Sequence, residues 1–186
     1  MLIVDLDAQG NASTGLGILP EHRVLSTYDI IVGSSDLSEV IKDTFVKDLF
    51  VAPATTDLSS SDIDLVANEK RTVVLRDSIH KLLESDTNFD YIIIDCPPAL
   101  SLLTINAFVA SHSVLVPLQA EFFALEGLSQ LMLTIREVRG TLNKYIKIQG
   151  IVLTMYDKRN NLSIQIEEDV RENLGKLVYD TVIPRN

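Results

Sequence analysis

Short apolar runs alternate with longer segments of helical spacing along most of the chain. The run Leu2-Ile3-Val4 ends in the carboxylates of Asp5 and Asp7, and the polar loop Ala8 to Gly17 follows it. Ser26 is a suitable N-cap for the next apolar stretch. By these criteria we expect strands over 2–7, 49–53, 91–95, 113–117, 148–153 and 177–183, and helices beginning near residue 26 and over 36–41, 61–84, 102–111, 124–139 and 162–174.

This order of elements predicts an α/β fold. Strands that alternate with helices form right-handed crossovers, so we expect a three-layer α/β/α arrangement around a mostly parallel, doubly wound sheet. The run from Tyr91 to Ile94 is wholly apolar, which is typical of strands covered on both faces. Functional side chains of such folds gather at the carboxyl ends of the strands.

The amino-acid composition restricts the kinds of molecule that the chain can bind. The 186 residues are 46% hydrophobic and carry a formal net charge of -10, so the chain as a whole repels DNA and anionic membranes, and any nucleic-acid contact must be local. No run approaches the length of a membrane helix, and the single cysteine, Cys96, excludes an internal disulfide. We therefore expect one domain over 1–186, cytoplasmic and without membrane contact.

Two of the expected strands end in aspartate. Asp5 and Asp7 close the first strand and Asp95 closes the strand over 91–95, where carboxylates can hold a hydrated divalent cation. Taken alone, Asp95 fits equally well a turn before Pro97-Pro98, and the loop over 8–17 fits an ordinary surface turn. The same loop could also reorganise around a γ-phosphate and its Mg²⁺.

Five ordered segments decide between these interpretations, because together they resemble the ParA/Soj family of partitioning ATPases. The resemblance spans the chain and implies the P-loop NTPase-like, deviant Walker fold shared with MinD-like ATPases, whose members dimerise with nucleotide. The segments are Asp5 to Gly17, Asp95-Cys96-Pro97-Pro98, Val116-Pro117-Leu118-Gln119 with Ala124-Leu125-Glu126-Gly127, Thr154-Met155-Tyr156-Asp157, and Val182-Ile183-Pro184-Arg185-Asn186.

The resemblance implies roles for individual residues. Asp7 would lie in switch I and orient the attacking water, and Asp95, with Asp7, would support Mg²⁺. Arg159 occupies a position where the family contacts DNA, although a solvated surface arginine is an equally good interpretation. The adenine of ATP or ADP would be lined by Thr154, Met155, Pro184, Arg185 and Asn186.

One defining motif of the family does not occur in these residues. No Gly-x-x-x-x-Gly-Lys-[Ser/Thr] pattern is found, although the family places its phosphate loop upstream of the segment that begins at Asp5. We therefore expect an incomplete domain, truncated at both ends, without the first strand, P-loop and first helix. Such a chain should not turn over ATP by itself, since phosphoryl transfer depends on positioning and charge stabilisation.

For the intact protein, the resemblance implies a partition ATPase. It would bind and hydrolyse ATP with Mg²⁺, form a homodimer on non-specific DNA at the nucleoid, and segregate a chromosome or plasmid when a ParB-like partner stimulates it. An alternative is a catalytically inactive remnant or binding module of the family. A MinD-like positioning ATPase is a third, disfavoured by the Asp7-Ala8-Gln9-Gly10-Asn11 segment and by the lack of a C-terminal amphipathic helix in these residues.

Overall fold

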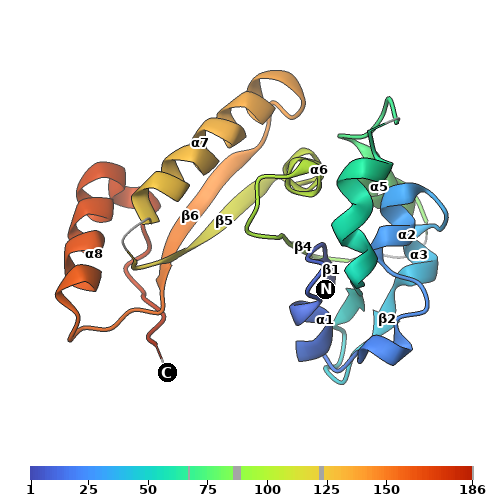
Figure 1. The fold of residues 1–186 in the computed structure, drawn as a ribbon, viewed down its shortest axis with the longest axis horizontal. Coiled ribbons are helices and arrows are strands. Elements are labelled where there is room, and N and C mark those ends of the chain that lie inside the picture. Colours follow the sequence, from blue (N-terminus) through green and yellow to red (C-terminus); the bar gives the residue numbers. More distant parts are fainter. Residues whose placement is uncertain (67, 86–88, 122–123, 186) are drawn as a thin grey trace. The chain divides into compact units, whose positions relative to one another are not determined.

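A computed structural model of the protein describes residues 1–66, 68–85, 89–121 and 124–185 (Figure 1). The chain divides into two compact units, Met1–Ala110 and Ser111–Asn186. Both units are α/β, and their strand pairs are parallel except for one, which confirms the predicted class with a mostly parallel sheet. The expectation of one domain over 1–186 stays a prediction.

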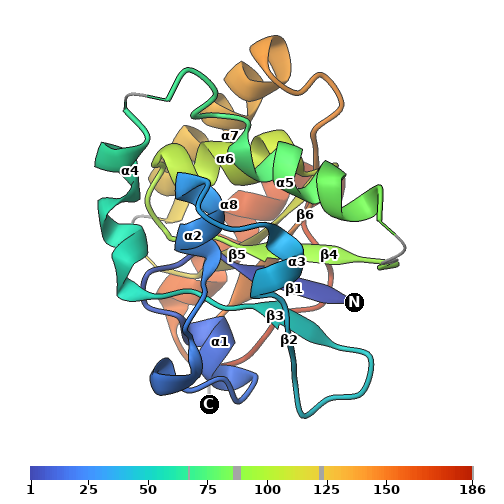
Figure 2. The same cartoon turned by 90° about the vertical axis from the view of Figure 1, so that its right-hand side faces the viewer.

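The first unit is built on four strands in the order β2-β3-β1-β4, which follow one another across the sheet in Figure 2. Strand β1 lies between β3 and β4 and is parallel to both, whereas β2 is antiparallel to β3. Strand β4 is therefore an edge of the described sheet. The bounds are Leu2–Asp5 for β1, Lys42–Asp43 for β2, Phe50–Ala52 for β3 and Ile92–Asp95 for β4.

In the described part of this unit six helices accompany the sheet, and α2, α3 and α5 gather at one side of the unit in Figure 1. Helix α2 begins where Ser26 was predicted to cap it. The Ser26 side chain accepts from the amide of Tyr28 at 3.2 Å, and Asp29 Oδ2 accepts from the amide of Ser26 at 2.8 Å, which completes a capping box. The helices are α1 Asn11–Gly15, α2 Thr27–Val32, α3 Leu37–Val40, α4 Ser61–Asp64, α5 Val74–Leu83 and α6 Leu102–Ala110, with 3₁₀ turns at Pro20–His22 and Thr56–Ser60.

The core of the first unit forms between one face of the sheet and these helices. Leu2 and Val4 of β1 are fully buried against Ile30 and Ile31 of α2 and against Leu75 of α5, among others. Burial of such side chains is the main stabilising contribution to the fold. Strand β4 behaves differently on its two faces, because Ile92 and Ile94 pack against this core while Ile93 is 50% exposed. The expectation of two covered faces is therefore wrong for this strand.

Two sequence-based boundaries in the first unit are also wrong. The helix expected over 61–84 is broken into α4 and α5, because Asn68 Oδ1 accepts from the amide of Lys70 at 2.8 Å, an Asx turn that competes with helix formation. The segment expected to be a loop over 8–17 contains helix α1, which begins at Asn11. The preceding residue, Gly10, has a left-handed backbone conformation with a φ of 62°.

The second unit is a βαβ arrangement followed by one more helix. Strands β5 and β6 are parallel, and α7, which connects them, lies along them in Figure 1. Fully buried Ile151 and Leu153 of β6 pack with Ile166 and Val170 of the last helix. The elements are β5 Ser113–Gln119, α7 Ala124–Thr141, β6 Lys147–Thr154, α8 Asn161–Leu174 and a 3₁₀ turn at Gly175–Leu177.

The final strand expected over 177–183 is wrong as a continuous element. In place of a continuous ladder there are isolated parallel bridges, Val178 with Ile151 within this segment and Pro184 with Tyr156 just after it. The amide of Tyr179 donates to the carbonyl of Ile151, and the amide of Ile183 donates to the carbonyl of Leu153. Between these two bonds the final segment advances by four residues, whereas β6 advances by two. The two additional residues bulge out of the sheet and interrupt the ladder.

No helix in the described ranges combines the length and the apolar character that crossing a membrane requires.

Candidate functional site

The carboxylates predicted to act together lie at the ends of two neighbouring strands. Asp5 of β1 and Asp95 of β4 are direct register partners in a parallel pair, and the amide of Leu6 donates to the carbonyl of Asp95 at 2.9 Å. Asp7 follows two residues beyond Asp5, at the same edge of the sheet. The first unit therefore brings the predicted site residues Asp7 and Asp95 to one place, at the carboxyl ends of parallel strands, where α/β folds form their sites.

Asp5 has a structural role in this arrangement. Its side chain is fully buried, and its Oδ2 accepts from both the amide and the hydroxyl of Ser13, at 2.8 and 2.6 Å. Oδ1 accepts from the amide of Asp7 at 3.1 Å. The Ser13 hydroxyl in turn accepts from the amide of Ala54 at 3.0 Å. Because these bonds saturate a buried carboxylate, Asp5 anchors the loop that carries Asp7.

The same loop is fastened a second time by a buried arginine, Arg23. Its guanidinium donates to the carbonyls of Ala54 at 2.9 Å and Ile18 at 2.8 Å, and to the hydroxyl of Thr14 at 2.7 Å. Gly10 passes so close that a Cβ at this position would lie 2.2 Å from a guanidinium nitrogen. The left-handed φ of Gly10 and this close approach explain why glycine stands here.

Asp7 and Asp95 keep their carboxylates available. Oδ1 of Asp7 accepts from the amide of Gln9 at 3.0 Å, and within the described ranges its other oxygen and the carboxylate of Asp95 have no hydrogen-bond partner. Asp95 is exposed, and neighbouring atoms partly desolvate its carboxylate. This desolvation raises the pKa of Asp95, and the nearby negative charges of Asp5 and Asp7 raise it further.

The thiol beside Asp95 has the properties expected of an unreactive cysteine. Burial, and next the negative charge of Asp95, raises the pKa of Cys96 to about 12. A thiol with such a pKa stays protonated at neutral pH and is a poor nucleophile.

This end of the sheet can support a cation but cannot enclose one by itself. Among the described residues, no group of three or more His, Cys, Asp or Glu side chains is arranged to hold a metal ion. Mg²⁺ is often bound through one or two carboxylates with waters and substrate phosphates completing its shell. The carboxylate of Asp95 and the second oxygen of Asp7, which have no hydrogen-bond partner among the described residues, fit that type of site.

The second unit contains an open groove at the other predicted binding segments. Its volume is about 430 Å³, within the range of small-molecule sites. Of the residues expected to contact adenine, Pro184 and Arg185 line this groove, whereas Thr154 and Met155 are not among its lining residues. Asn186 lies outside the described residues. The lining residues are Tyr156, Asp157, Lys158, Arg159, Val182, Pro184 and Arg185.

Backbone contacts hold the two walls of the groove together. The amide of Tyr156 donates to the carbonyl of Ile183, and the amide of Arg185 donates to the carbonyl of Tyr156, both at 3.1 Å. Met155 adopts a left-handed φ of 52°, which is unusual for a residue with a side chain. This conformation turns the chain from β6 into the groove wall, so Met155 contributes through its backbone.

Arg159, the predicted DNA contact, is held by a carboxylate of the same wall. Its side chain is 90% exposed and bonds to both oxygens of Asp157, at 3.0 and 2.9 Å, and its amide bonds to Asp157 Oδ1 at 2.9 Å. These hydrogen bonds lower the pKa of Asp157 to about 2. The arginine is thus accessible to solvent, but its guanidinium already has an anionic partner.

Sequence reasoning missed several residues that shape these two sites. Ser13 and Arg23 fasten the loop of Asp7, yet both are isolated polar residues in segments that resemble surface turns. Arg171 binds the segment before Pro184, but on a charged helix face it is indistinguishable from a solvated arginine. The local signal for Ser13 is its place as a small polar residue between Gly10 and Gly15, in the loop that follows the first strand.

Comparisons with known proteins agree with this geometry. A family model described as an AAA domain matches residues 1–148. The chain is 49% identical to the chromosome partitioning protein ParA of Caulobacter vibrioides, covering all of this chain and 69% of that protein. It is also 49% identical to the sporulation initiation inhibitor protein Soj of Bacillus subtilis, covering all of this chain and 72% of that protein.

Among solved structures, the fold resembles cobyrinic acid a,c-diamide synthase from Mycobacterium smegmatis with bound ATP analog and magnesium. The TM-score is 0.89 at 35% sequence identity, covering 100% of this chain and 74% of that chain. This likeness confirms the predicted P-loop NTPase-like fold.

Proposed function

Since the chain belongs to the ParA/Soj family of chromosome-partitioning ATPases, we propose that it forms the switch and base-binding part of a Mg²⁺-dependent ATPase that segregates DNA. The observation that carries the proposal is the pairing of Asp5 with Asp95, which brings Asp7 and Asp95 to one edge of a parallel sheet. This activity also requires a phosphate-binding loop, and the Gly-x-x-x-x-Gly-Lys-[Ser/Thr] pattern of such a loop does not occur in these 186 residues.

At the end of the sheet where the carboxylates lie, Asp7 and Asp95 have different roles, Asp95 toward the cation and Asp7 toward a water. Asp95 has no internal hydrogen-bond donor among the described residues, so its charge is available to the water shell of a cation. When bound, Mg²⁺ supplies charge neutralisation for the phosphates of the nucleotide. The second oxygen of Asp7 can accept a hydrogen bond from a water and orient it, while Asp5 and Arg23 hold the loop in place.

In the second unit, the groove between the wall 156–159 and the wall 182–185 would take the adenine of ATP or ADP. Its two walls are joined by backbone bonds, and its volume suits a purine. Thr154 ends β6 and Met155 follows it. Both remain proposed contributors, as does Asn186. The ATP analog and magnesium bound to the Mycobacterium smegmatis relative support nucleotide binding at this fold.

DNA contact is proposed for Arg159, which is exposed and could bind a phosphate in exchange for Asp157. The protein would act as an ATP-dependent homodimer on non-specific DNA in the cytoplasm, at the nucleoid, and a ParB-like partner would stimulate hydrolysis. The cargo is a chromosome or a plasmid. The names of the Caulobacter vibrioides and Bacillus subtilis relatives support a partitioning or related regulatory role.

The decisive experiment uses the protein expressed from its complete reading frame. Phosphate release is measured with ATP, Mg²⁺, double-stranded DNA and a ParB-like partner, alongside nucleotide binding. Asp7→Ala should lower turnover by about 100-fold while ATP still binds, because the residue orients water and not the nucleotide. Asp95→Ala should instead weaken Mg²⁺-dependent binding as well.

Asp43→Asn is the matched control, since this exposed carboxylate lies on β2 of the same unit and away from Asp95. It should leave turnover unchanged. Unaltered turnover in Asp7→Ala would show that the proposal is wrong. The 186-residue chain alone should neither bind ATP at micromolar concentration nor release phosphate.

The lack of a P-loop pattern in these residues favours a second candidate, an inactive remnant or binding module. The DNA upstream of Met1 separates the two. An in-frame Lys-Gly-Gly-x-Gly-Lys-[Ser/Thr] sequence supports the ATPase, whereas a stop codon directly before Met1 supports the remnant.

A further inference from the structure

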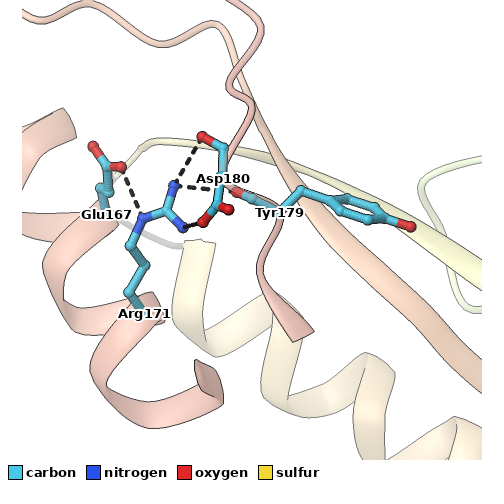
Figure 3. A network of polar contacts seen from close by, with 4 residues as sticks. All are labelled: Glu167, Arg171, Tyr179 and Asp180. Carbon is cyan, nitrogen blue, oxygen red and sulfur yellow. Dashed lines mark hydrogen bonds and ion pairs between the residues drawn. The ribbon is translucent and has the colours of Figure 1, made fainter. Parts of the chain in front are cut away.

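The segment after α8 is held in place by one side chain where its β-ladder is interrupted. Between the bonds of Tyr179 to Ile151 and of Ile183 to Leu153, the chain bulges away from β6. Arg171 of α8 binds this bulge, donating to the carbonyl of Tyr179 at 3.1 Å and to that of Asp180 at 3.5 Å (Figure 3). These bonds satisfy carbonyls that have left the ladder.

Arg171 is itself fixed from the opposite side. Its Nε donates to Oε1 of Glu167 at 2.9 Å, one helical turn earlier. The hydroxyl of Tyr156 also interacts with the carboxylate of Glu167, and this interaction raises the pKa of Tyr156 and lowers that of Glu167. A planar guanidinium with several donors can hold a carboxylate and two carbonyls at once, which the single charged nitrogen of lysine cannot do.

These contacts form a closed path around the groove. Tyr156 lies in the near wall and is bonded through its backbone to Ile183 and Arg185 of the far wall. Its hydroxyl interacts with Glu167, which accepts a hydrogen bond from Arg171, and Arg171 in turn donates to the chain just before the far wall. The width of the groove therefore depends on where Arg171 holds the bulge.

We propose that Arg171 is a positioning residue for the nucleotide base, which sets the place of Val182, Pro184 and Arg185 opposite Tyr156. This inference rests on the proposed function, in which the groove takes the adenine. Arg171 does not line that groove and acts through the segment that it holds. Without it, the bulge loses its charged anchor and the far wall can move relative to the near one.

The test measures ATP and GTP affinity and kcat of the complete reading-frame product carrying Arg171→Gln. We expect ATP affinity to fall about tenfold and the preference for ATP over GTP to shrink, with kcat at saturating ATP unchanged. Arg171→Lys should restore only part of the affinity. Arg136→Gln, an exposed arginine on α7 of the same unit, is the control for lost charge and should have no effect.

A second measurement, amide hydrogen exchange on the same variants, does not require nucleotide. In Arg171→Gln, the amides of Ile183 and Arg185 should exchange faster, while those of β5 should not change. Unaltered ATP affinity and base preference in Arg171→Gln would overturn the inference, even with faster exchange. If Arg185→Ala also leaves base preference intact, the proposed base groove itself is wrong, which separates the two failures.

Discussion

The hydroxyl of Ser13 donates a 2.6 Å hydrogen bond to Oδ2 of buried Asp5 and accepts the amide of Ala54. Ser13→Ala removes both bonds and leaves a buried amide without a partner. We expect a loss of roughly 1–3 kcal/mol in the free energy of unfolding, measured by urea denaturation. Ser59→Ala, which removes an exposed hydroxyl, should change it by less than about 0.5 kcal/mol, and equal losses in both variants would contradict the role of Ser13.

The fit between Gly10 and Arg23 leads to a second prediction. Gly10→Ala places a methyl group 2.2 Å from the guanidinium and strains a backbone φ of 62°, so we expect the variant to be destabilised by about 1–3 kcal/mol. Gly15→Ala adds its methyl group in open space on α1 and should be neutral or slightly stabilising. Thermal unfolding of both proteins checks this difference, and a stable Gly10→Ala protein would refute the close approach.

Asp157 should compete with DNA for Arg159. In the complete reading-frame product, Asp157→Asn removes an exposed ion pair, so DNA affinity should rise about two- to five-fold at low salt. Glu172→Gln changes the net charge equally on an exposed position of α8 and controls for the general electrostatic effect. Titration of labelled double-stranded DNA, followed by fluorescence anisotropy, measures both.

The same experiment repeated with Arg159→Gln identifies the cause. If Asp157 acts through Arg159, the effect of Asp157→Asn beyond the control disappears in the Arg159→Gln background. An effect that persists would show that Asp157 repels DNA directly. If the single variant Arg159→Gln binds DNA as tightly as the wild-type protein does, Arg159 is not a DNA contact.

The stability that Glu167 contributes through its interactions with Tyr156 and Arg171 should depend on pH. The hydrogen bond from Tyr156, and then the bonds from Arg171, lower the pKa of Glu167 below its usual 4.5. A carboxylate whose pKa is lowered by folding stabilises the protein above its unfolded pKa, and this contribution is lost as pH falls through the folded value. Urea unfolding of wild-type and Glu167→Gln protein at pH 7 and pH 3.5 should therefore show a difference that shrinks at the lower pH.

Features that depend on neighbours in sequence could be predicted. The N-cap at Ser26 and the apolar strand before Asp95 are local patterns, and the structure has both. The location of Asp7 and Asp95 at one end of the sheet also follows from the alternation of strands and helices, because the carboxyl ends of parallel strands lie together, whereas the direct pairing of β1 with β4 comes from the structure.

Features that depend on distant contacts could not be predicted. Asp5 was interpreted as a neighbour of Asp7 in the chemistry, but Ser13 and its own burial make it an anchor. The strand expected over 177–183 fails because of the bulge that Arg171 holds, and no residue within that segment signals the bulge. In both cases the deciding partner lies eight residues away, beyond the reach of periodicity.

Strand β4 bonds through its backbone to β1 and is otherwise an edge of the described sheet, with Tyr91 and Ile93 turned to solvent. The unpaired backbone N–H and C=O groups of such an edge can form hydrogen bonds with an extended segment of another polypeptide, including a second copy of this chain. The 186-residue polypeptide, purified alone and concentrated, should therefore scatter more light with time. Light scattering that stays constant with time at high protein concentration would contradict this role of the β4 edge.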